Sequence, residues 1–202
     1  KNRGPDNSVE RVFNFKEYNI YYKFHRLAIN GLNSESNQPF IINNIALICN
    51  GEIYNYKKLA QEYDINLITD SDCEIILHLY QLIGIQLVKL LDGVFSFILL
   101  DLNNGLLYFS HDPIGVRPLF MIENEEEIIL SSELKCLNNF KGEIKLINPG
   151  VYLEYNMNND QLEEFSYYNF NYDIKYINES DCITMIQDLL YQSVNKRLLT
   201  DR

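Results

Sequence analysis

The sequence predicts an α+β fold in which helices cover layered antiparallel sheets. Short strand-like runs follow one another between residues 94 and 155, and close turns such as Asn103-Asn104-Gly105 separate them, which favours antiparallel pairing. Two other segments repeat apolar residues at helical spacing. The 202 residues are 47% hydrophobic and 22% charged, an ordinary globular composition that supports a sizeable core.

The strand predictions depend on apolar, β-branched or aromatic runs bounded by turn residues. Residues 1–19 are polar and are predicted to be rich in turns, and the Asn-rich stretches 156–159 and 169–178 are predicted to form surface excursions. The predicted strands span residues 21–29, 45–49, 94–101, 106–110, 118–122 and 127–131, with at least one more within 146–155.

Helices are predicted at two places with clear signals and at a third with a weaker one. Ser71 and Glu74 have the spacing of a capping box, which predicts a helix over residues 72–83 that ends before Gly84. Near the C-terminus, apolar residues from 183 to 198 recur at helical spacing after a cap predicted at Ser180. Residues 56–62 form a third, helix-like run.

The charge balance disfavours several classes of partner. Seventeen basic and 28 acidic residues give a net charge of −11, which repels phosphate backbones and anionic lipid. No apolar run approaches the ~18 residues that a membrane helix needs. We therefore expect neither a nucleic-acid nor a membrane partner.

The spacing of the four cysteines argues against a zinc site and against a small disulfide scaffold. Cys49, Cys73, Cys136 and Cys182 include no C-x-x-C pair, and the three histidines are scattered. The expectation is four reduced, mostly buried thiols in a cytoplasmic protein that holds no metal here.

Three polar sites stand out, and each has an ordinary structural alternative. Asn50 and Gly51 end an apolar strand and could offer two donors to an oxyanion, although Asn-Gly is commonly just a turn. Asp72 lies in the first turn of a predicted helix and could meet an ammonium group or simply cap the helix. Arg26 could hold a carboxylate in a bidentate fork or be a surface arginine. A cation, a paired donor and an anion together would hold an α-amino acid while polarising its side-chain amide.

Eight motifs occur in a fixed order along the chain: Arg3-Gly4-Pro5-Asp6 and residues 24–28, 50–55, 71–74, 91–95, 112–120, 132–135 and 149–150. In this order they resemble the glutaminase domain of glutamine-dependent asparagine synthetases, which are class II glutamine amidotransferases with the N-terminal-nucleophile hydrolase fold. The resemblance spans nearly the whole chain. It implies a four-layer αββα sandwich of antiparallel sheets.

The resemblance also implies roles for individual residues. It assigns the glutamine α-carboxylate to Arg26, the oxyanion hole to Asn50 and Gly51, further substrate contacts to Glu52, and the α-ammonium group to Asp72. The other residues expected to line the glutamine pocket are Leu27, Ala28, Ile29 and Asn30.

One departure from the family is important. The family's nucleophile is an N-terminal cysteine whose own α-amine carries the proton, whereas residue 1 here is Lys. An internal cysteine cannot replace it because its nitrogen is acylated, and Cys49 is expected to be a core thiol. We therefore expect the chain to be an internal segment of a longer, active protein.

The domain prediction follows from the same resemblance. Residues 1–178 are expected to form the amidotransferase domain without its N-terminal segment, and residues 179–202 to begin the ATP-binding synthetase domain. The glutaminase portion needs no cofactor, whereas ATP and Mg²⁺ are expected in the synthetase domain. The expected partners are L-glutamine and the synthetase domain, reached through an ammonia channel, and a homodimer is left open.

The predicted function is glutamine hydrolysis that supplies ammonia for the ATP-dependent conversion of aspartate to asparagine. Two alternatives stay open from the sequence. One is an amidotransferase with another acceptor, and the other is a catalytically silent domain that binds glutamine or acts as a scaffold.

Overall fold

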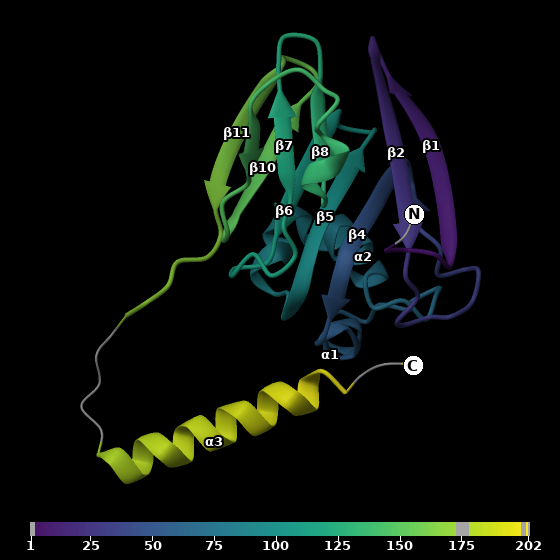
Figure 1. Cartoon of the computed structure of the whole chain (residues 1–202). Coiled ribbons are helices and arrows are strands. Elements are labelled where there is room, and N and C mark those ends of the chain that lie inside the picture. The colour runs from purple at the N-terminus through teal and green to yellow at the C-terminus, as the bar shows by residue number, and fades with distance from the viewer. Residues whose placement is uncertain (1–2, 173–177, 199–200, 202) are drawn as a thin grey trace.

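The central element of this computed structural model, which describes residues 3–172, 178–198 and 201, is a six-stranded antiparallel sheet (Figure 1). Its strand order is β11-β10-β6-β5-β4-β3, and consecutive strands pair antiparallel throughout. The strands are β3 (Phe40–Ile42), β4 (Ile45–Ile53), β5 (Gly93–Asp101), β6 (Leu106–His111), β10 (Val151–Asn156) and β11 (Gln161–Ser166). The antiparallel α+β prediction is therefore confirmed.

Helices cover one face of this sheet. They are α1 (Tyr56–Glu62), α2 (Glu74–Ile83) and the 3₁₀ helix η1 (Gly84–Lys89). Leu47 and Phe97 project from the sheet into a core that includes Ile76 and Leu79 of α2, and all four side chains are almost completely buried. Since side chains alternate along a strand, the neighbours of Leu47 and Phe97 face the opposite side.

Two small sheets cover that opposite face. One is the hairpin of β1 (Asn7–Phe15) and β2 (Tyr18–Arg26), and the other has the order β8-β7-β9. The strands of the second sheet are β7 (Phe120–Glu123), β8 (Ile128–Ser131) and β9 (Ile144–Leu146), and the short 3₁₀ helix η2 (Leu134–Cys136) lies between β8 and β9. The described residues form three of the four expected layers, namely the helices, the central sheet and the layer of the two small sheets.

β1 corrects the prediction that residues 1–19 are merely turn-rich. Its side chains are mostly exposed or half-buried, so the segment is polar and carries a weak hydrophobic pattern. Phe13 and Phe15 pack with Tyr22 of β2 in a core cluster, and nine paired residues along β2 complete the hairpin. Pairing with β2 across the tight turn at Lys16 and Glu17 makes this segment a strand, although its own hydrophobic pattern is weak.

The segments that follow residue 143 agree with the prediction only in part. The strand predicted within residues 146–155 is confirmed as β10, whereas Leu146 ends β9, a strand of a different sheet that was not predicted separately. Residues 156–159 belong to the tight connection between β10 and β11 rather than to a surface excursion. Of the second predicted excursion, residues 173–177 lie outside the described residues.

The capping box predicted at α2 is wrong. The helix begins at Glu74, and Cys73 is the N-cap residue without a side-chain capping bond. The Glu74 carboxylate instead turns towards the preceding loop and accepts the N–H groups of Ile68 at 2.8 Å and Thr69 at 2.6 Å. Because that loop packs over the start of α2, Glu74 is buried and serves as its anchor.

The last helix, α3 (Glu179–Lys196), stands apart from the sheets (Figure 1). Its cap is Asn178, whose Oδ1 accepts the N–H of Asp181 at 2.9 Å, so the cap predicted at Ser180 is wrong. None of the described residues of α3 is buried, although Leu190 and Val194 belong to an apolar stripe. No described helix has the length and apolar character needed to cross a membrane.

Candidate functional site

Three strand ends meet at one edge of the central sheet. In the antiparallel register, Asn50 of β4 lies opposite Ser96 of β5, and Ser96 lies opposite His111 of β6. The end of β4, the start of β5 and the end of β6 therefore share this edge. The predicted oxyanion residues Asn50 and Gly51 lie on β4, next to the start of β5.

Asn50 and Gly51 lie within β4, which continues to Ile53, so the turn alternative is wrong. A Cβ atom on Gly51 would lie 2.1 Å from the carbonyl oxygen of Val94, which leaves room only for glycine. Ala46 and Ile48 of β4 belong to the cluster beneath the β1–β2 hairpin. By alternation along the strand, the side chains of Asn50 and Glu52 project from that same face.

Arg26, at the end of β2, is buried rather than a surface arginine. Its four terminal N–H groups all reach the following loop. Nη1 donates to the Asn33 carbonyl at 3.1 Å and to Asn37 Oδ1 at 2.9 Å, and Nη2 donates to the carbonyls of Asn30, at 3.0 Å, and Gly31. In this conformation the fork holds the loop, so an incoming carboxylate would have to replace some of these carbonyl oxygens.

The Arg-Gly-Pro-Asp motif fixes the start of this loop. The Asp6 carboxylate accepts the Ala28 N–H at 2.8 Å, and the Asp6 N–H donates to the Arg26 carbonyl at 3.0 Å. Gly4 lies so close to β2 that a Cβ atom would sit 2.1 Å from the His25 carbonyl oxygen. The motif therefore positions the strand end that carries Arg26.

The predicted pocket residues 27–30 differ in exposure. Leu27 is 49% exposed, Ala28 is buried, and Ile29 and Asn30 are half-buried. The C-terminal segment also reaches this stretch, because the Gly31 N–H donates to Asp201 Oδ2 at 2.8 Å and the Asp201 N–H donates to the Ile29 carbonyl at 3.2 Å. The backbone of residues 28–31 is thus held from two sides.

Asp72 does not cap α2 through its side chain but faces β4. Its Oδ2 accepts the Ile53 N–H at 2.6 Å, and the Asn30 side chain also bonds to its carboxylate. Burial raises the pKa of Asp72, and these hydrogen bonds offset only part of that effect. A buried carboxylate of this kind gains from a cationic ligand, so the site suits an ammonium group.

Electrostatic contacts bring the predicted residues together. The charge of Asp72 acts on the Arg26 guanidinium, and the charge of Glu52 acts on Asp72. Arg26, Asn30 and Glu52 therefore each lie within electrostatic or hydrogen-bonding range of Asp72, near the end of β4 that carries Asn50 and Gly51. Leu27 was also predicted to line the glutamine pocket, but its side chain is exposed.

Arg117 is a site residue that sequence reasoning did not single out. Its Nη2 lies 3.8 Å from Glu52 Oε1. The run Asp112-Pro113-Ile114-Gly115 before it has the composition of a tight turn, and that signal could have placed Arg117 at a strand end.

The cysteines follow the prediction in part. All four are free, and Cys49 and Cys73 are buried, but Cys136 is exposed and Cys182 is only partly covered. Cys73 Sγ donates to the Gly51 carbonyl at 3.6 Å. Its hydrogen bond with Cys49, followed by burial, raises the pKa of Cys73 well above the ordinary value, which makes this thiol a poor nucleophile.

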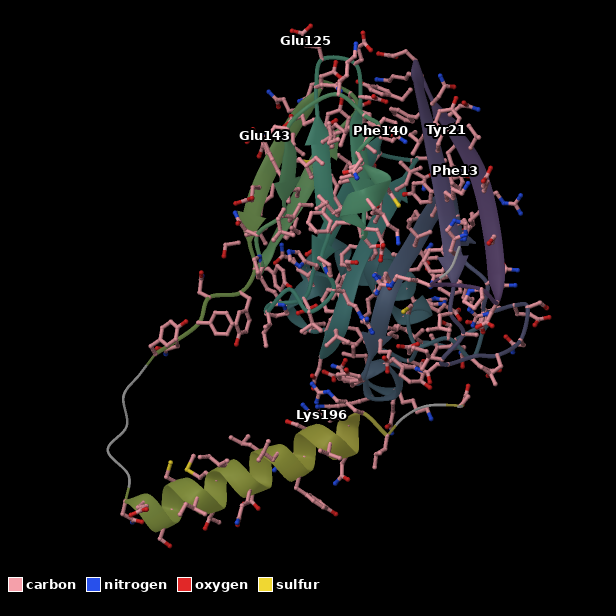
Figure 2. The ribbon with its side chains drawn as sticks, viewed as in Figure 1. Phe13, Tyr21, Glu125, Phe140, Glu143 and Lys196 are labelled. Carbon is pink, nitrogen blue, oxygen red and sulfur yellow. The ribbon has the colours of Figure 1, made fainter. Side chains whose placement is uncertain are left out.

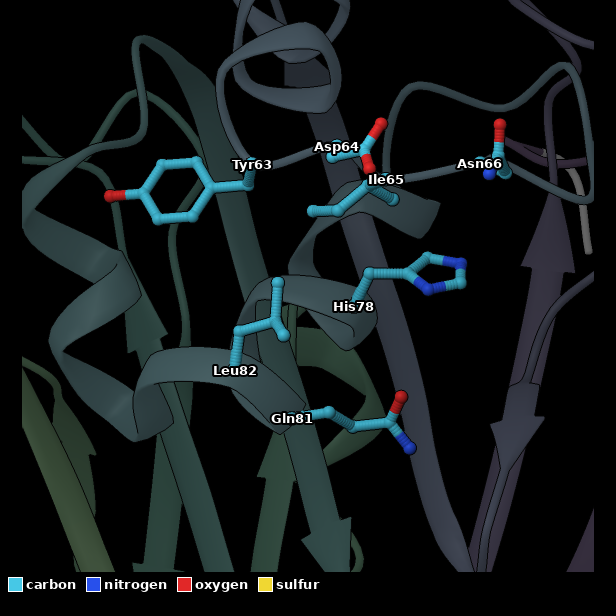
Figure 3. Close-up of a pocket in the computed structure, with 7 residues that line it drawn as sticks. All are labelled: Tyr63, Asp64, Ile65, Asn66, His78, Gln81 and Leu82. Carbon is cyan, nitrogen blue, oxygen red and sulfur yellow. The ribbon is translucent and has the colours of Figure 1, made fainter.

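A surface hollow lies away from this site, between the end of α1 and α2 (Figure 3). His78 and Gln81 line it, and His78 is bound to Glu74 at 2.8 Å. None of the predicted site residues borders it. Among the described residues, no group of three or more His, Cys, Asp or Glu side chains could hold a metal ion.

The comparisons with known proteins agree with this geometry. A family model described as a glutamine amidotransferase domain matches residues 1–188. The fold is also found in the solved glutamine phosphoribosylpyrophosphate amidotransferase from B. subtilis, with a TM-score of 0.61, 22% identity, and coverage of 75% of this chain and 35% of that chain. This chain belongs to the glutamine amidotransferase domain family.

Curated relatives are named as glutamine-hydrolysing asparagine synthetases. A probable asparagine synthetase from Acanthamoeba polyphaga mimivirus is 35% identical over 223 residues, which cover 100% of this chain and 40% of the relative. The Bos taurus asparagine synthetase is 43% identical over 148 residues, which cover 69% of this chain and 25% of the relative. The chain thus spans well under half the length of these relatives.

Proposed function

We propose that this chain is the glutamine-hydrolysing domain of an asparagine synthetase. In this proposal L-glutamine is the substrate, and its amide nitrogen leaves as ammonia. The ammonia passes through a channel to a synthetase domain, where ATP and Mg²⁺ drive the conversion of aspartate to asparagine. Family membership and the names of the relatives support the proposal. A cytoplasmic location and a homodimer remain expectations.

One observation carries the assignment of the substrate. A buried arginine, a buried aspartate and a strand end with an amide side chain meet at one edge of the sheet. An α-amino acid needs a cation for its carboxylate and an anion for its ammonium group, and Arg26 and Asp72 supply these. Asn50 and Gly51 lie where an amide group attached to the same molecule could be polarised.

The residues of this chain would act on the amide by position and charge. Arg26 would exchange loop carbonyl oxygens for the substrate carboxylate, and Asp72 with Glu52 would bind the ammonium group. The Asn50 side chain and the Gly51 N–H would donate to the amide oxygen as negative charge develops on it. Such donors are worth a few kcal/mol in acyl-transfer reactions.

We also propose that residues 179–202 begin the second domain. In support, α3 buries none of its described residues against the sheets and displays an apolar stripe. Its C-terminal end, where Figure 2 labels Lys196, approaches the domain. Lys196 Nζ lies 2.5 Å from Asp92 Oδ2, and the Arg197 guanidinium lies 5.0 Å from the ring centre of Tyr54. A helix with an exposed apolar stripe is expected to be covered by another folded unit.

Calorimetry with L-glutamine tests the substrate assignment. We expect the chain to bind L-glutamine and not D-glutamine, and Asp72→Asn to weaken binding by about tenfold or more because the ammonium group loses its charged partner. Asp188→Asn, at an exposed position on α3, is the control and should bind normally. Absence of L-glutamine binding, or equal binding by Asp72→Asn, would contradict the proposed function.

A further inference from the structure

The loop that carries Arg117 is built around one buried carboxylate. Asp112 is 1% exposed, and its Oδ1 accepts the N–H groups of Ile114 at 3.1 Å and Val116 at 3.0 Å. Its Oδ2 accepts those of Arg117 at 3.1 Å and Phe95 at 3.2 Å. Four backbone donors on one carboxylate tie the backbone of Arg117 to the first residues of β5, beside the end of β4.

The turn inside this loop is equally constrained. Gly115 has a φ of +75°, and a Cβ atom there would lie 3.1 Å from both the His111 ring and Pro149. Its N–H donates to the Asp112 carbonyl at 3.0 Å. The loop therefore holds Arg117 at the edge of the sheet with little freedom in the backbone.

The guanidinium of Arg117 lies where its charge, rather than its hydrogen bonds, acts on a neighbouring side chain. Nη2 lies 3.8 Å from Glu52 Oε1, where the two side chains are 30% and 19% exposed. Nε is buried and has no hydrogen-bond partner among the described residues. A buried donor without a partner costs free energy, so a position that tolerates one points to a functional constraint.

Glu52 needs such a cation because it stands near a second carboxylate. The charge of Glu52 acts unfavourably on Asp72, which is buried. Two carboxylates that share an ammonium ligand repel each other while the site is empty. The positive charge of Arg117, 3.8 Å from Glu52, offsets this repulsion and holds the Glu52 carboxylate.

We propose that Arg117 is a positioning residue for amino-acid binding that acts through Glu52. It holds the Glu52 carboxylate in place to receive the ammonium group of the bound amino acid, and the loop around Asp112 holds Arg117 in turn. This inference deepens the proposed function and depends on it.

A double-mutant cycle with L-glutamine as the probe tests the inference. Calorimetry would compare the unmodified chain with Arg117→Met, Glu52→Gln and the double variant. We expect Arg117→Met to weaken binding about five- to thirtyfold, which lies within the range of coupling energies between contacting residues. If Arg117 acts through Glu52, the double variant binds no more weakly than Glu52→Gln alone. Additive losses, or unchanged binding by Arg117→Met, would overturn the inference.

Matched variants separate positioning from folding. Arg117→Lys keeps the charge and should recover most of the affinity, and Arg117→Gln provides a second uncharged variant in case the methionine variant does not fold. Lys145→Met removes the cation of an exposed ion pair with the same 3.8 Å separation, from Glu123, and should bind normally. If the unmodified chain itself binds no L-glutamine, the proposed function fails and the inference fails with it. Normal binding by the unmodified chain and by both uncharged variants refutes the inference alone.

Discussion

Two buried carboxylates two residues apart behave in opposite ways. Asp72 faces β4, where burial raises its pKa more than its hydrogen bonds lower it. Burial also acts to raise the pKa of Glu74, but hydrogen bonds from Thr69, Ile68 and His78 outweigh it and bring the pKa below the ordinary value. The balance between desolvation and hydrogen bonding therefore differs between the two carboxylates, so that Glu74 is a structural anchor whereas Asp72 has capacity left for a ligand.

The raised pKa of Asp72 predicts the pH dependence of ligand binding. Only the ionised carboxylate attracts an ammonium group, so affinity for L-glutamine should increase as the pH rises through the pKa of Asp72 and then level off. Because this pKa is above the ordinary value, the loss on acidification begins at a higher pH than for an exposed aspartate. Calorimetry between about pH 4 and 8 measures it. An Asp72→Asn variant with the same pH profile would contradict this origin.

The lowered pKa of Glu74 predicts an effect on stability. Its ionised form contributes stability that is present above its unfolded-state pKa and is lost as the pH falls through the lower folded-state pKa. Glu74→Gln replaces one acceptor oxygen by a donor facing other donors, so we expect about 1–3 kcal/mol lower free energy of unfolding in urea at neutral pH. The exposed neighbour Asp70→Asn is the control. A loss below about 0.5 kcal/mol would show that these bonds add little.

At the scale of elements, α3 differs from all helices that cover the sheet. Residues of α1, α2 and η1 enter one core cluster, whereas none of the described residues of α3 is buried. Its tie to the domain is at one end, through Lys196, Arg197 and Asp201. Helix periodicity predicted that α3 exists, but periodicity cannot report which surface covers its apolar stripe.

The exposure of α3 predicts that the domain folds without it. A chain ending at residue 178 should keep its free energy of unfolding to within about 2 kcal/mol, because the described contacts that it loses are one exposed ion pair, the Arg197–Tyr54 contact and two hydrogen bonds of Asp201. Urea unfolding of the two chain lengths, followed by circular dichroism, provides the comparison. A loss above about 3 kcal/mol would mean that α3 packs on the domain.

At the scale of the whole molecule, the site depends on segments that lie far apart in the sequence. Arg26 comes from the small hairpin, Asn50 and Glu52 from the central sheet, Asp72 from the start of α2, and Arg117 from the loop after β6. The sheet register joins two of these segments, because β5 pairs with both β4 and β6, and Asp72 is joined by its bond to Ile53. Arg26 lies on the separate β1–β2 hairpin and is related to the site by its electrostatic contact with Asp72. All of these residues lie within this chain, so under the proposed function a change at the site should alter glutamine hydrolysis without altering synthesis from free ammonia.

Asn50→Ala in the full-length protein tests this separation. We expect glutamine affinity within several-fold of the unmodified protein, because carboxylate and ammonium contacts remain. Glutaminase turnover should fall by about a hundredfold or more, because one oxyanion donor is lost. Synthesis supplied with free ammonia should be unaffected, which serves as the internal control. Unchanged glutaminase turnover would remove Asn50 from its assigned role.

The sequence by itself determined the antiparallel α+β class, most strand positions and the existence of α2 and α3. These depend on local periodicity and turn residues, which short stretches of chain report directly. The roles of Arg26, Asn50 and Asp72 came from motif resemblance and remain predictions. The structure corrected their local setting, since Asn50-Gly51 is strand and Asp72 bonds to β4.

Only the tertiary structure decided what each polar group contacts. Residues 7–15 pair with β2 as a strand, and the Glu74 carboxylate binds the loop that precedes it. Loop carbonyl oxygens bind the guanidinium of Arg26, and the guanidinium of Arg117 lies beside Glu52. Each of these contacts joins residues that backbone register or loop packing brings next to each other in space. Local propensity carries no record of such partners, whereas the free energy of a buried polar group depends on them almost entirely.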